Sequence, residues 1–204
     1  ALSKVTDLLY RISDAAASRN VAETKQLMGE LRSRHVNLAS DLLEQSPALK
    51  ESAVSRVNTI CDSLEELVNA VCAVGELSDR NKAIIISNGE LLSSTIICFT
   101  MNAKGIRTNF IDARNMMITS DEYLKGEPVA DEIVSRVPPV INEAYKGMDA
   151  VITQGFIGSN LAGEQTVLGR GGSDYSASLI GMAMDAERIE IWTDVDGVRS
   201  ADPR

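Results

Sequence analysis

The segment Leu168–Leu179, with the sequence LGRGGSDYSASL, combines residue types suited to holding an anion. It contains three glycines beside one arginine, followed by a Ser-Asp pair: Gly169, Arg170, Gly171, Gly172, Ser173 and Asp174. Glycine lets backbone N–H groups approach a ligand closely, and a helix beginning here would turn its positive end toward the same ligand. The guanidinium of Arg170 suits a carboxylate or phosphate. We therefore predict an anion site at a helix N-terminus, with an ordinary glycine-rich surface turn as the alternative.

Three further segments carry polar side chains among small residues: Ser3–Leu8 (SKVTDL), Ser87–Leu92 (SNGELL) and Thr193–Arg204 (TDVDGVRSADPR). The sequence contains no GxxxxGK[ST], GxSxG, HExxH or CxxC motif and no protein-kinase signature set. A P-loop enzyme, a hydrolase of the nucleophile-elbow type and a zinc protease are therefore not expected.

Composition indicates a globular protein with an aliphatic core. Of the 204 residues, 44% are hydrophobic, 24% are charged and 4% are aromatic. The net charge of −9 argues against a nucleic-acid partner and against an anionic membrane surface. No apolar run appears long enough to span a membrane, and no signal-peptide pattern is present. We expect a cytoplasmic protein.

The cysteines and the single histidine do not predict a metal site. Cys61, Cys72 and Cys98 are odd in number, lack metal-type spacing and lie in apolar helical patterns. We expect them to be reduced core residues, and we assign His35 no role.

Residues 1–78 are predicted to form a helical lobe. Val5, Leu8, Leu9 and Ile12 follow the helical period, and a similar stripe runs from Val54 to Val71. Pro47 should separate the second helix from the third.

Residues 79–204 alternate between predicted strands and helices. The expected strands are Ala83–Ser87, Thr108–Ala113, Ala150–Gln154 and Arg188–Thr193. The expected helices are Leu91–Met101, Ala130–Tyr145 and Ser173–Asp185, with Pro138-Pro139 bending the second or marking a join. This order indicates an α/β fold with a mostly parallel sheet covered by helices, where ligands gather at the carboxyl ends of the strands. Because the chain starts and stops abruptly, we expect a piece of a longer protein with at least one strand missing at each end.

Taken in this order, the four segments resemble the aspartokinases of the amino-acid-kinase superfamily. LGRGGSDYSA is highly specific for that family, and SNGELLS is similar to its S-x-GE motif. WTDVDGV…ADPR resembles its nucleotide loop, and ALSKVTDLL resembles the segment after its second strand. The resemblance covers nearly the whole chain. It implies a three-layer αβα sandwich, incomplete here, that lacks the opening lysine-glycine segment and the regulatory domains. A fusion of the full-length protein with homoserine dehydrogenase stays open.

The resemblance also implies the reaction and the residue roles. Aspartokinases transfer the γ-phosphoryl of ATP, carried with Mg²⁺, to the side-chain carboxylate of aspartate. Arg170 would bind the α-carboxylate of aspartate beside Ser173 and the Gly171-Gly172 backbone, and Glu90 would receive its ammonium group. Thr6 would hydrogen-bond the substrate, and Asp174 would orient phosphate-binding lysines. Nucleotide contacts would come from four residues near the C-terminus: Thr193, Asp194, Arg199 and Arg204.

Each role has a simpler alternative. Glu90 could be only an acid at a helix N-terminus, Asp174 only a first-turn residue and Thr6 a plain helix residue. Arg199 stands where many relatives carry an aromatic residue. Because the opening lysine is absent, we expect no measurable kinase activity from these 204 residues alone.

Two other functions remain open from the sequence. The same fold could act on glutamate, acetylglutamate, carbamate or a nucleoside monophosphate, or it could be a non-catalytic amino-acid-binding module. Glu90 and Arg170 together favour an α-amino acid, because its ammonium and carboxylate need opposite charges. Exposed sheet edges predict self-association into a homo-oligomer.

Overall fold

The computed structural model describes residues 1–169 and 171–192, and its first part is a layer of three helices. These are α1 (Val5–Ala17), α2 (Val21–Leu42) and α3 (Pro47–Val74). The apolar stripe of α1 is buried as expected, and Pro47 is the first residue of α3. Gly75 ends α3 with φ 73°, a conformation that glycine adopts without a steric penalty. The predicted helical region is therefore confirmed.

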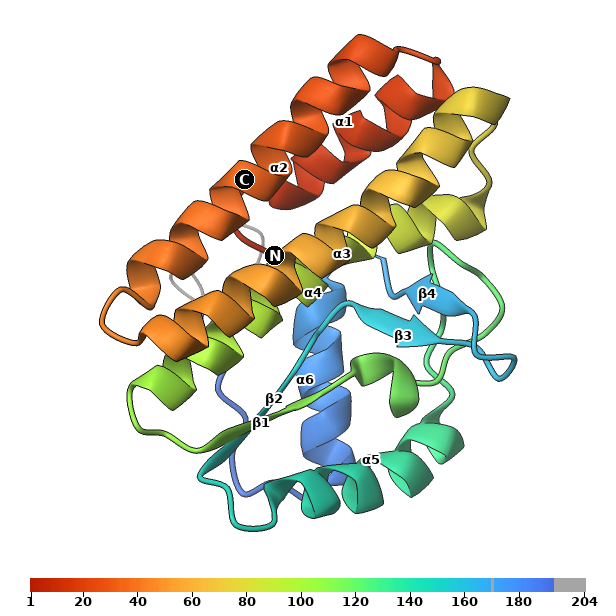
Figure 1. Cartoon of the computed structure of the whole chain (residues 1–204). Coiled ribbons are helices and arrows are strands. Elements are labelled where there is room, and N and C mark those ends of the chain that lie inside the picture. Colours follow the sequence, from red (N-terminus) through yellow and green to blue (C-terminus); the bar gives the residue numbers. More distant parts are fainter. Residues whose placement is uncertain (170, 193–204) are drawn as a thin grey trace, which may run out of the picture.

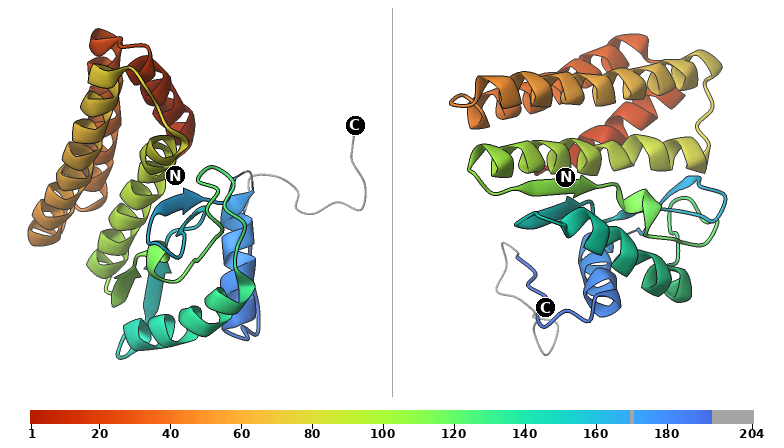
Figure 2. Two further views of the ribbon diagram at one scale, coloured as in Figure 1. Left: turned by 90° about the vertical axis from the view of Figure 1, so that its right-hand side faces the viewer. Right: turned by 60° about the horizontal axis from the view of Figure 1, so that its bottom comes forward.

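Helix α4 (Asp79–Ala103) corrects the expectation for the next segment. The predicted strand Ala83–Ser87 is wrong, because these residues lie inside α4, which begins where the Ser78 hydroxyl accepts a hydrogen bond from the Asn81 N–H. The helix packs against α1 and α3 on one side and against strands on the other, as Figure 2 shows. Apolar residues are needed all round such a helix, and a short stretch of it cannot be told from a buried strand.

The sheet contains the two strands that follow α4. The strands β1 (Thr108–Ile111) and β2 (Ala150–Thr153) pair in parallel, with Thr108 opposite Ala150 and Ile111 opposite Thr153. Helix α4 covers one face, and α5 (Ala130–Tyr145) packs on the other together with α6 (Gly172–Ala183) (Figure 1). The described part of the chain thus has the expected αβα layers around a parallel pair. Helix α5 continues through Pro138-Pro139.

A small hairpin and a short 3-10 helix lie beside this sheet, and the hairpin packs against α4. The hairpin pairs β3 (Ile157–Ser159) with β4 (Gln165–Val167) in antiparallel register, and β4 packs against α4. The 3-10 helix η1 (Ala113–Asn115) begins where Asp112 accepts a hydrogen bond from the Arg114 N–H. Neither element was expected, and η1 shortens the predicted strand to Ile111.

The last expected strand, Arg188–Thr193, is wrong for residues 188–192, which adopt no regular structure. No described strand runs beside them, so their backbone groups lack the neighbour that a strand requires. Ile191 is 48% exposed and Trp192 is 90% exposed. Thr193 lies outside the described residues.

The core is aliphatic, as the composition indicates. One buried cluster joins α1–α4, and a second lies between the sheet, α5 and α6 and includes Met116 and Met117. All three cysteines are free thiols; Cys61 and Cys72 are buried and Cys98 is half-buried. Contrary to the sequence expectation, α4 is long and apolar enough to cross a membrane, but more than half of its most apolar stretch is buried inside the protein.

Candidate functional site

One hollow brings together every predicted aspartate-contacting residue that the structure describes. It has a volume of about 500 Å³ and lies where α1, α4, the hairpin and the start of α6 meet. The predicted residues in its wall are Thr6, Glu90, Gly171, Gly172, Ser173 and Asp174. These residues come from three helices that are far apart in sequence. Arg170 lies outside the described residues, but its neighbours Gly169 and Gly171 both line the hollow.

The glycine segment forms the predicted turn into a helix. Gly169 has φ 76° and Gly171 has φ 75°, and Gly171 is the residue that precedes α6. Gly172 is buried, and a Cβ there would come within 2.9 Å of Leu168 and 3.0 Å of Phe156. Among the described residues no side chain caps this end of α6, so the helix presents its first turn and positive dipole end to the hollow.

A serine inside α6 fixes the loop after β2 against this turn. The Ser176 hydroxyl donates to the Gly172 carbonyl at 2.7 Å and accepts from the Phe156 N–H at 3.0 Å. Phe156 has φ 68°, which is unusual for a residue other than glycine, and its carbonyl accepts from the Leu168 N–H at 2.8 Å. Ser176 therefore connects both sides of the glycine segment.

Glu90 reaches the hollow from the middle of α4, and its side chain is 16% exposed. Both the expected strand end before Glu90 and the alternative of an acid at a helix N-terminus are therefore wrong. Gly89 allows α1 to pack closely, because a Cβ there would lie 3.2 Å from Val5 and 3.3 Å from Leu9. This approach brings Thr6, in the first turn of α1, to the same hollow as Glu90.

The Glu90 carboxylate lines the hollow with only 16% of its side chain exposed. A partly buried carboxylate in this position can accept hydrogen bonds from an amine in the hollow, and charge-assisted contacts of this kind are short and strong.

The hollow is also lined by residues to which the sequence assigned no role, namely Asp7, Tyr10, Leu124, Phe156 and Val167. Asp7 and Tyr10 follow Thr6 on α1, so the helical spacing from Thr6 to Tyr10 could have indicated a shared face. Leu124 and Phe156 come from loops, where no periodic signal exists. Within residues 1–169 and 171–192, no three His, Cys, Asp or Glu side chains are close enough to hold a metal ion.

The described wall combines groups that suit both ends of an amino acid. Carboxylates suit an ammonium group, hydroxyls of Thr6 and Ser173 suit hydrogen bonding, and the start of α6 suits an anion. The predicted nucleotide residues Thr193, Asp194, Arg199 and Arg204 lie outside the described residues.

Known proteins similar to this chain are aspartokinases. A maize chloroplastic bifunctional aspartokinase/homoserine dehydrogenase is 29% identical over the whole chain, which spans 22% of that relative. The structure resembles Escherichia coli aspartokinase III in complex with lysine and aspartate, with a TM-score of 0.86 and 26% identity, and the same enzyme with aspartate and ADP, with a TM-score of 0.82. Each comparison covers 97% of this chain and 42% of the solved chain.

The sequence also matches a whole protein family. Residues 3–204 match the Amino acid kinase family, which is nearly the complete sequence. The αβα layers, the glycine turn into α6 and the carboxylate on α4 therefore have a common explanation: the chain belongs to the amino acid kinase family.

Proposed function

We propose that this chain is the aspartate-binding portion of an aspartokinase, which transfers the γ-phosphoryl of ATP to the side-chain carboxylate of L-aspartate. The observation that carries the proposal is the single hollow lined by Thr6, Glu90 and the start of α6. An aspartokinase with the same fold binds aspartate and ADP, which supports this choice of ligands.

The two ends of the amino acid require opposite partners. Glu90 binds the substrate ammonium, and Arg170 binds the α-carboxylate together with Ser173 and the Gly171-Gly172 backbone. Thr6 donates a hydrogen bond to the substrate. The side-chain carboxylate, the nucleophile, needs little activation, so the task of the site is alignment and neutralisation of charge.

Asp174 is the acid of the hollow that lies on α6, whereas Asp7 and Glu90 lie on α1 and α4. It lies in the first turn of α6 and lines the hollow, so its carboxylate can orient cationic groups that face the transferring phosphoryl. Thr193, Asp194, Arg199 and Arg204 contact the nucleotide, which brings Mg²⁺ with it. Since no lysine or arginine among the described residues lines the hollow, we expect no turnover from these 204 residues in a coupled ATP/aspartate assay.

Binding of aspartate can be measured without turnover. We expect isothermal titration calorimetry to show that the chain binds L-aspartate and binds succinate, which lacks the ammonium group, much more weakly. Glu90→Gln should weaken L-aspartate binding about tenfold, or roughly 1.4 kcal/mol, because the charge-assisted contact is lost.

The control is Glu66→Gln, which removes one negative charge from an exposed position on α3. Its affinity for L-aspartate should equal that of the unmodified chain. Equal affinity for succinate and L-aspartate, or an unchanged affinity in Glu90→Gln, would exclude the proposed role of Glu90.

Assembly and location follow from the same proposal. The free thiols agree with a reducing compartment such as the cytoplasm. In the described residues β2 has β1 as its one strand partner, and this open edge favours assembly with a second copy.

A further inference from the structure

A second groove lies on the other side of α4 from the candidate aspartate site. It consists of two adjoining hollows of about 280 and 500 Å³ between α3, α4 and β1. Four residues line both hollows: Arg56, Thr59, Thr95 and Phe110. We call it the Arg56 groove. Its combined size is that of a site for a small molecule, for which roughly 300–1,000 Å³ is usual.

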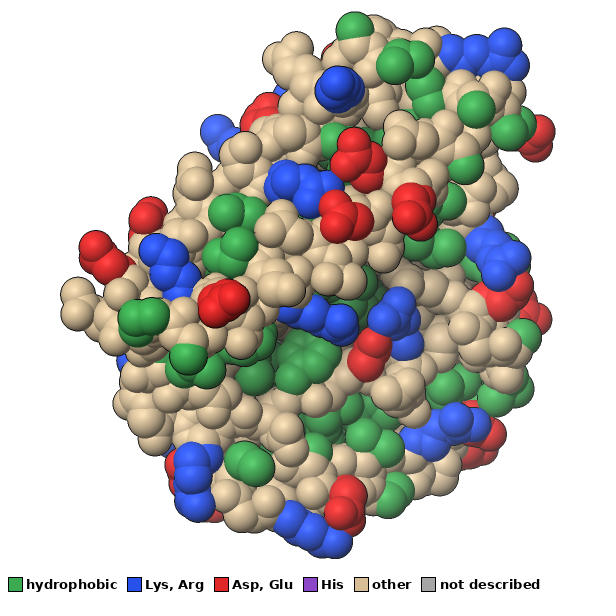
Figure 3. All heavy atoms as spheres, in the orientation of Figure 1, with side chains coloured by type: hydrophobic (Ala, Val, Ile, Leu, Met, Phe, Trp, Pro, Cys, Tyr) green, Lys and Arg blue, Asp and Glu red, His purple; other side chains and the backbone are tan. Residues whose placement is uncertain are grey.

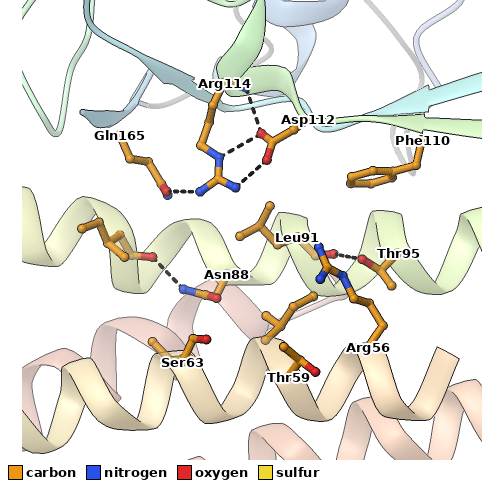
Figure 4. Close-up of a pocket in the computed structure, with 13 residues that line it drawn as sticks. Arg56, Thr59, Ser63, Asn88, Leu91, Thr95, Phe110, Asp112, Arg114 and Gln165 are labelled. Carbon is orange, nitrogen blue, oxygen red and sulfur yellow. Dashed lines mark hydrogen bonds and ion pairs between the residues drawn. The ribbon is translucent and has the colours of Figure 1, made fainter. Parts of the chain in front are cut away.

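One end of the Arg56 groove is polar, and most of its polar groups already have partners. Arg114 donates to Asp112 at 2.8 and 2.5 Å and to the Gln165 amide oxygen at 2.7 Å (Figure 4). Burial raises the pKa of Asp112, but its hydrogen bonds with Arg114 and the positive charges of Arg114 and Arg56 together lower it below its ordinary value. Asp112 is therefore charged at neutral pH, and its negative charge offsets one positive charge of the groove. Gln165 in turn donates to the Ser87 hydroxyl.

Arg56 is the one other charged residue that lines the described part of the groove. Its side chain rises from α3 toward Leu91 and Thr95, and no hydrogen bond or ion pair joins it to the other residues drawn in Figure 4. With Asp112 and Arg114 balanced, the groove carries the single positive charge of Arg56. A ligand that completes this site is therefore an anion.

The other end of the groove is mainly apolar. The second hollow is lined by Phe99, Phe110 and Cys98 as well as by Arg56. The space-filling view in Figure 3 shows a hollow below α3 with hydrophobic side chains on its floor and charged side chains at its edge. Aromatic walls next to one guanidinium favour a ligand with both an apolar body and an acidic group.

We propose that the Arg56 groove binds a small amphipathic anion, with its acidic group on Arg56 and its apolar body against Phe110 and Phe99. The site is separate from the candidate aspartate site, because no residue within 1–169 and 171–192 lines both and α4 forms a wall of each. The proposal does not depend on the kinase function.

A fluorescent anion of this shape tests the proposal directly. 8-Anilino-1-naphthalenesulfonate carries two aromatic ring systems and one sulfonate, and N-phenyl-1-naphthylamine has the same rings without the sulfonate. We call the first compound the sulfonate and the second the neutral amine. We expect one molecule of the sulfonate to bind saturably to each folded chain. Arg56→Gln should weaken its binding at least fivefold and leave binding of the neutral amine within twofold.

The matched control is Arg11→Gln, which removes one positive charge from an exposed position on α1. Binding of the sulfonate to this variant should stay within twofold of the unmodified chain. Equal loss in Arg11→Gln and Arg56→Gln, or no loss in Arg56→Gln, would overturn the proposal.

Cys98 reports where the sulfonate binds. It lines the apolar end of the groove and is half-buried, whereas Cys61 and Cys72 are buried. A saturating amount of the sulfonate should slow the alkylation of Cys98 by iodoacetamide at least threefold, measured by mass spectrometry of the labelled peptide. The same concentration should give less protection in Arg56→Gln, and an unchanged rate in the unmodified chain would place the sulfonate elsewhere and refute the site.

Discussion

His35, the one histidine of the chain, is a buried residue whose charge state matters for stability. Its Nδ1 lies 2.7 Å from the Leu31 carbonyl oxygen, and its Nε2 is buried without a described partner. Burial lowers the pKa of His35; the Leu31 hydrogen bond opposes that change, and nearby positive charge at Arg34 adds to it. The imidazole is therefore neutral in the folded protein at neutral pH.

This lowered pKa predicts a loss of stability in mild acid. The unfolded chain binds a proton at His35 near pH 6.5 and the folded chain only at lower pH. The free energy of unfolding should thus be highest above pH 6.5 and fall as the pH drops, by at most about 1.4 kcal/mol per pH unit. Urea unfolding followed by circular dichroism from pH 7.5 to 5.5 measures this slope.

His35→Leu separates the histidine from all other groups that titrate. The variant has no proton to gain at this position, so its stability should change less between pH 7 and 5.5 than that of the unmodified chain. An equal slope in both proteins would show that another group causes the change.

At the scale of elements, the hydroxyl of Ser176 links α6 to the loop after β2 by a hydrogen bond. Ser176 is 1% exposed and bonds both Phe156 and Gly172, whereas Ser178 on the same helix is exposed and bonds only the Asp174 carbonyl. The N–H that donates to Ser176 belongs to Phe156, whose backbone is in the left-handed region. The shape of the glycine turn thus depends on a residue in the helix behind it.

Replacing the two serines should have different effects. Ser176→Ala leaves the part-buried Phe156 N–H without its partner and should lower the free energy of unfolding by about 1–3 kcal/mol. Ser178→Ala should change it by no more than about 0.5 kcal/mol, because its site is exposed. Urea titrations of both variants test this, and equal losses would mean that the Ser176 contacts do not stabilise the turn.

How well each element could be predicted depends on how many of its sides are buried. Helix α1 buries one stripe, so its sequence has a clear helical period, and β1, β2 and α5 were also predicted within a few residues. The segment Ala83–Ser87 was misassigned because α4 is buried on two sides. The strands of the hairpin have three residues each, which is too short for any periodic signal.

The candidate site was predictable for a different reason. Glycines, a carboxylate and hydroxyls in a specific order resemble a known family even where the secondary structure is misassigned. Glu90 lines the predicted hollow although it lies within a helix rather than after a strand. Tyr10 and Phe156 were missed, because their place in the hollow depends on how α1 and the loop after β2 pack.

At the scale of the whole molecule, α4 belongs to both parts of the structure. It packs on α1 and α3 and also on β1 and β4, and the larger buried cluster extends from α1 to β4. A division of the chain into residues 1–78 and 79–204 remains a prediction. Separating α4 from either side would expose buried apolar surface to water.

We therefore expect one cooperative unfolding transition. Burial raises the pKa of the Cys61 thiol on α3 to about 11, so at pH 8 this thiol is protonated and shielded in the folded chain. Alkylation of Cys61 and far-ultraviolet circular dichroism should give the same urea midpoint. Exposure of Cys61 at clearly lower urea would show that the helical layer unfolds first.

The position of α4 has one more consequence. Asn88 and Glu90 are two residues apart and thus point to opposite sides of a helix with 3.6 residues per turn, one toward the Arg56 groove and one toward the candidate aspartate site. A ligand that shifts α4 by binding on one side therefore also shifts the wall of the site on the other side. Thermodynamic reciprocity then requires two such occupants to alter each other's affinity by the same factor, with no moving domain between them.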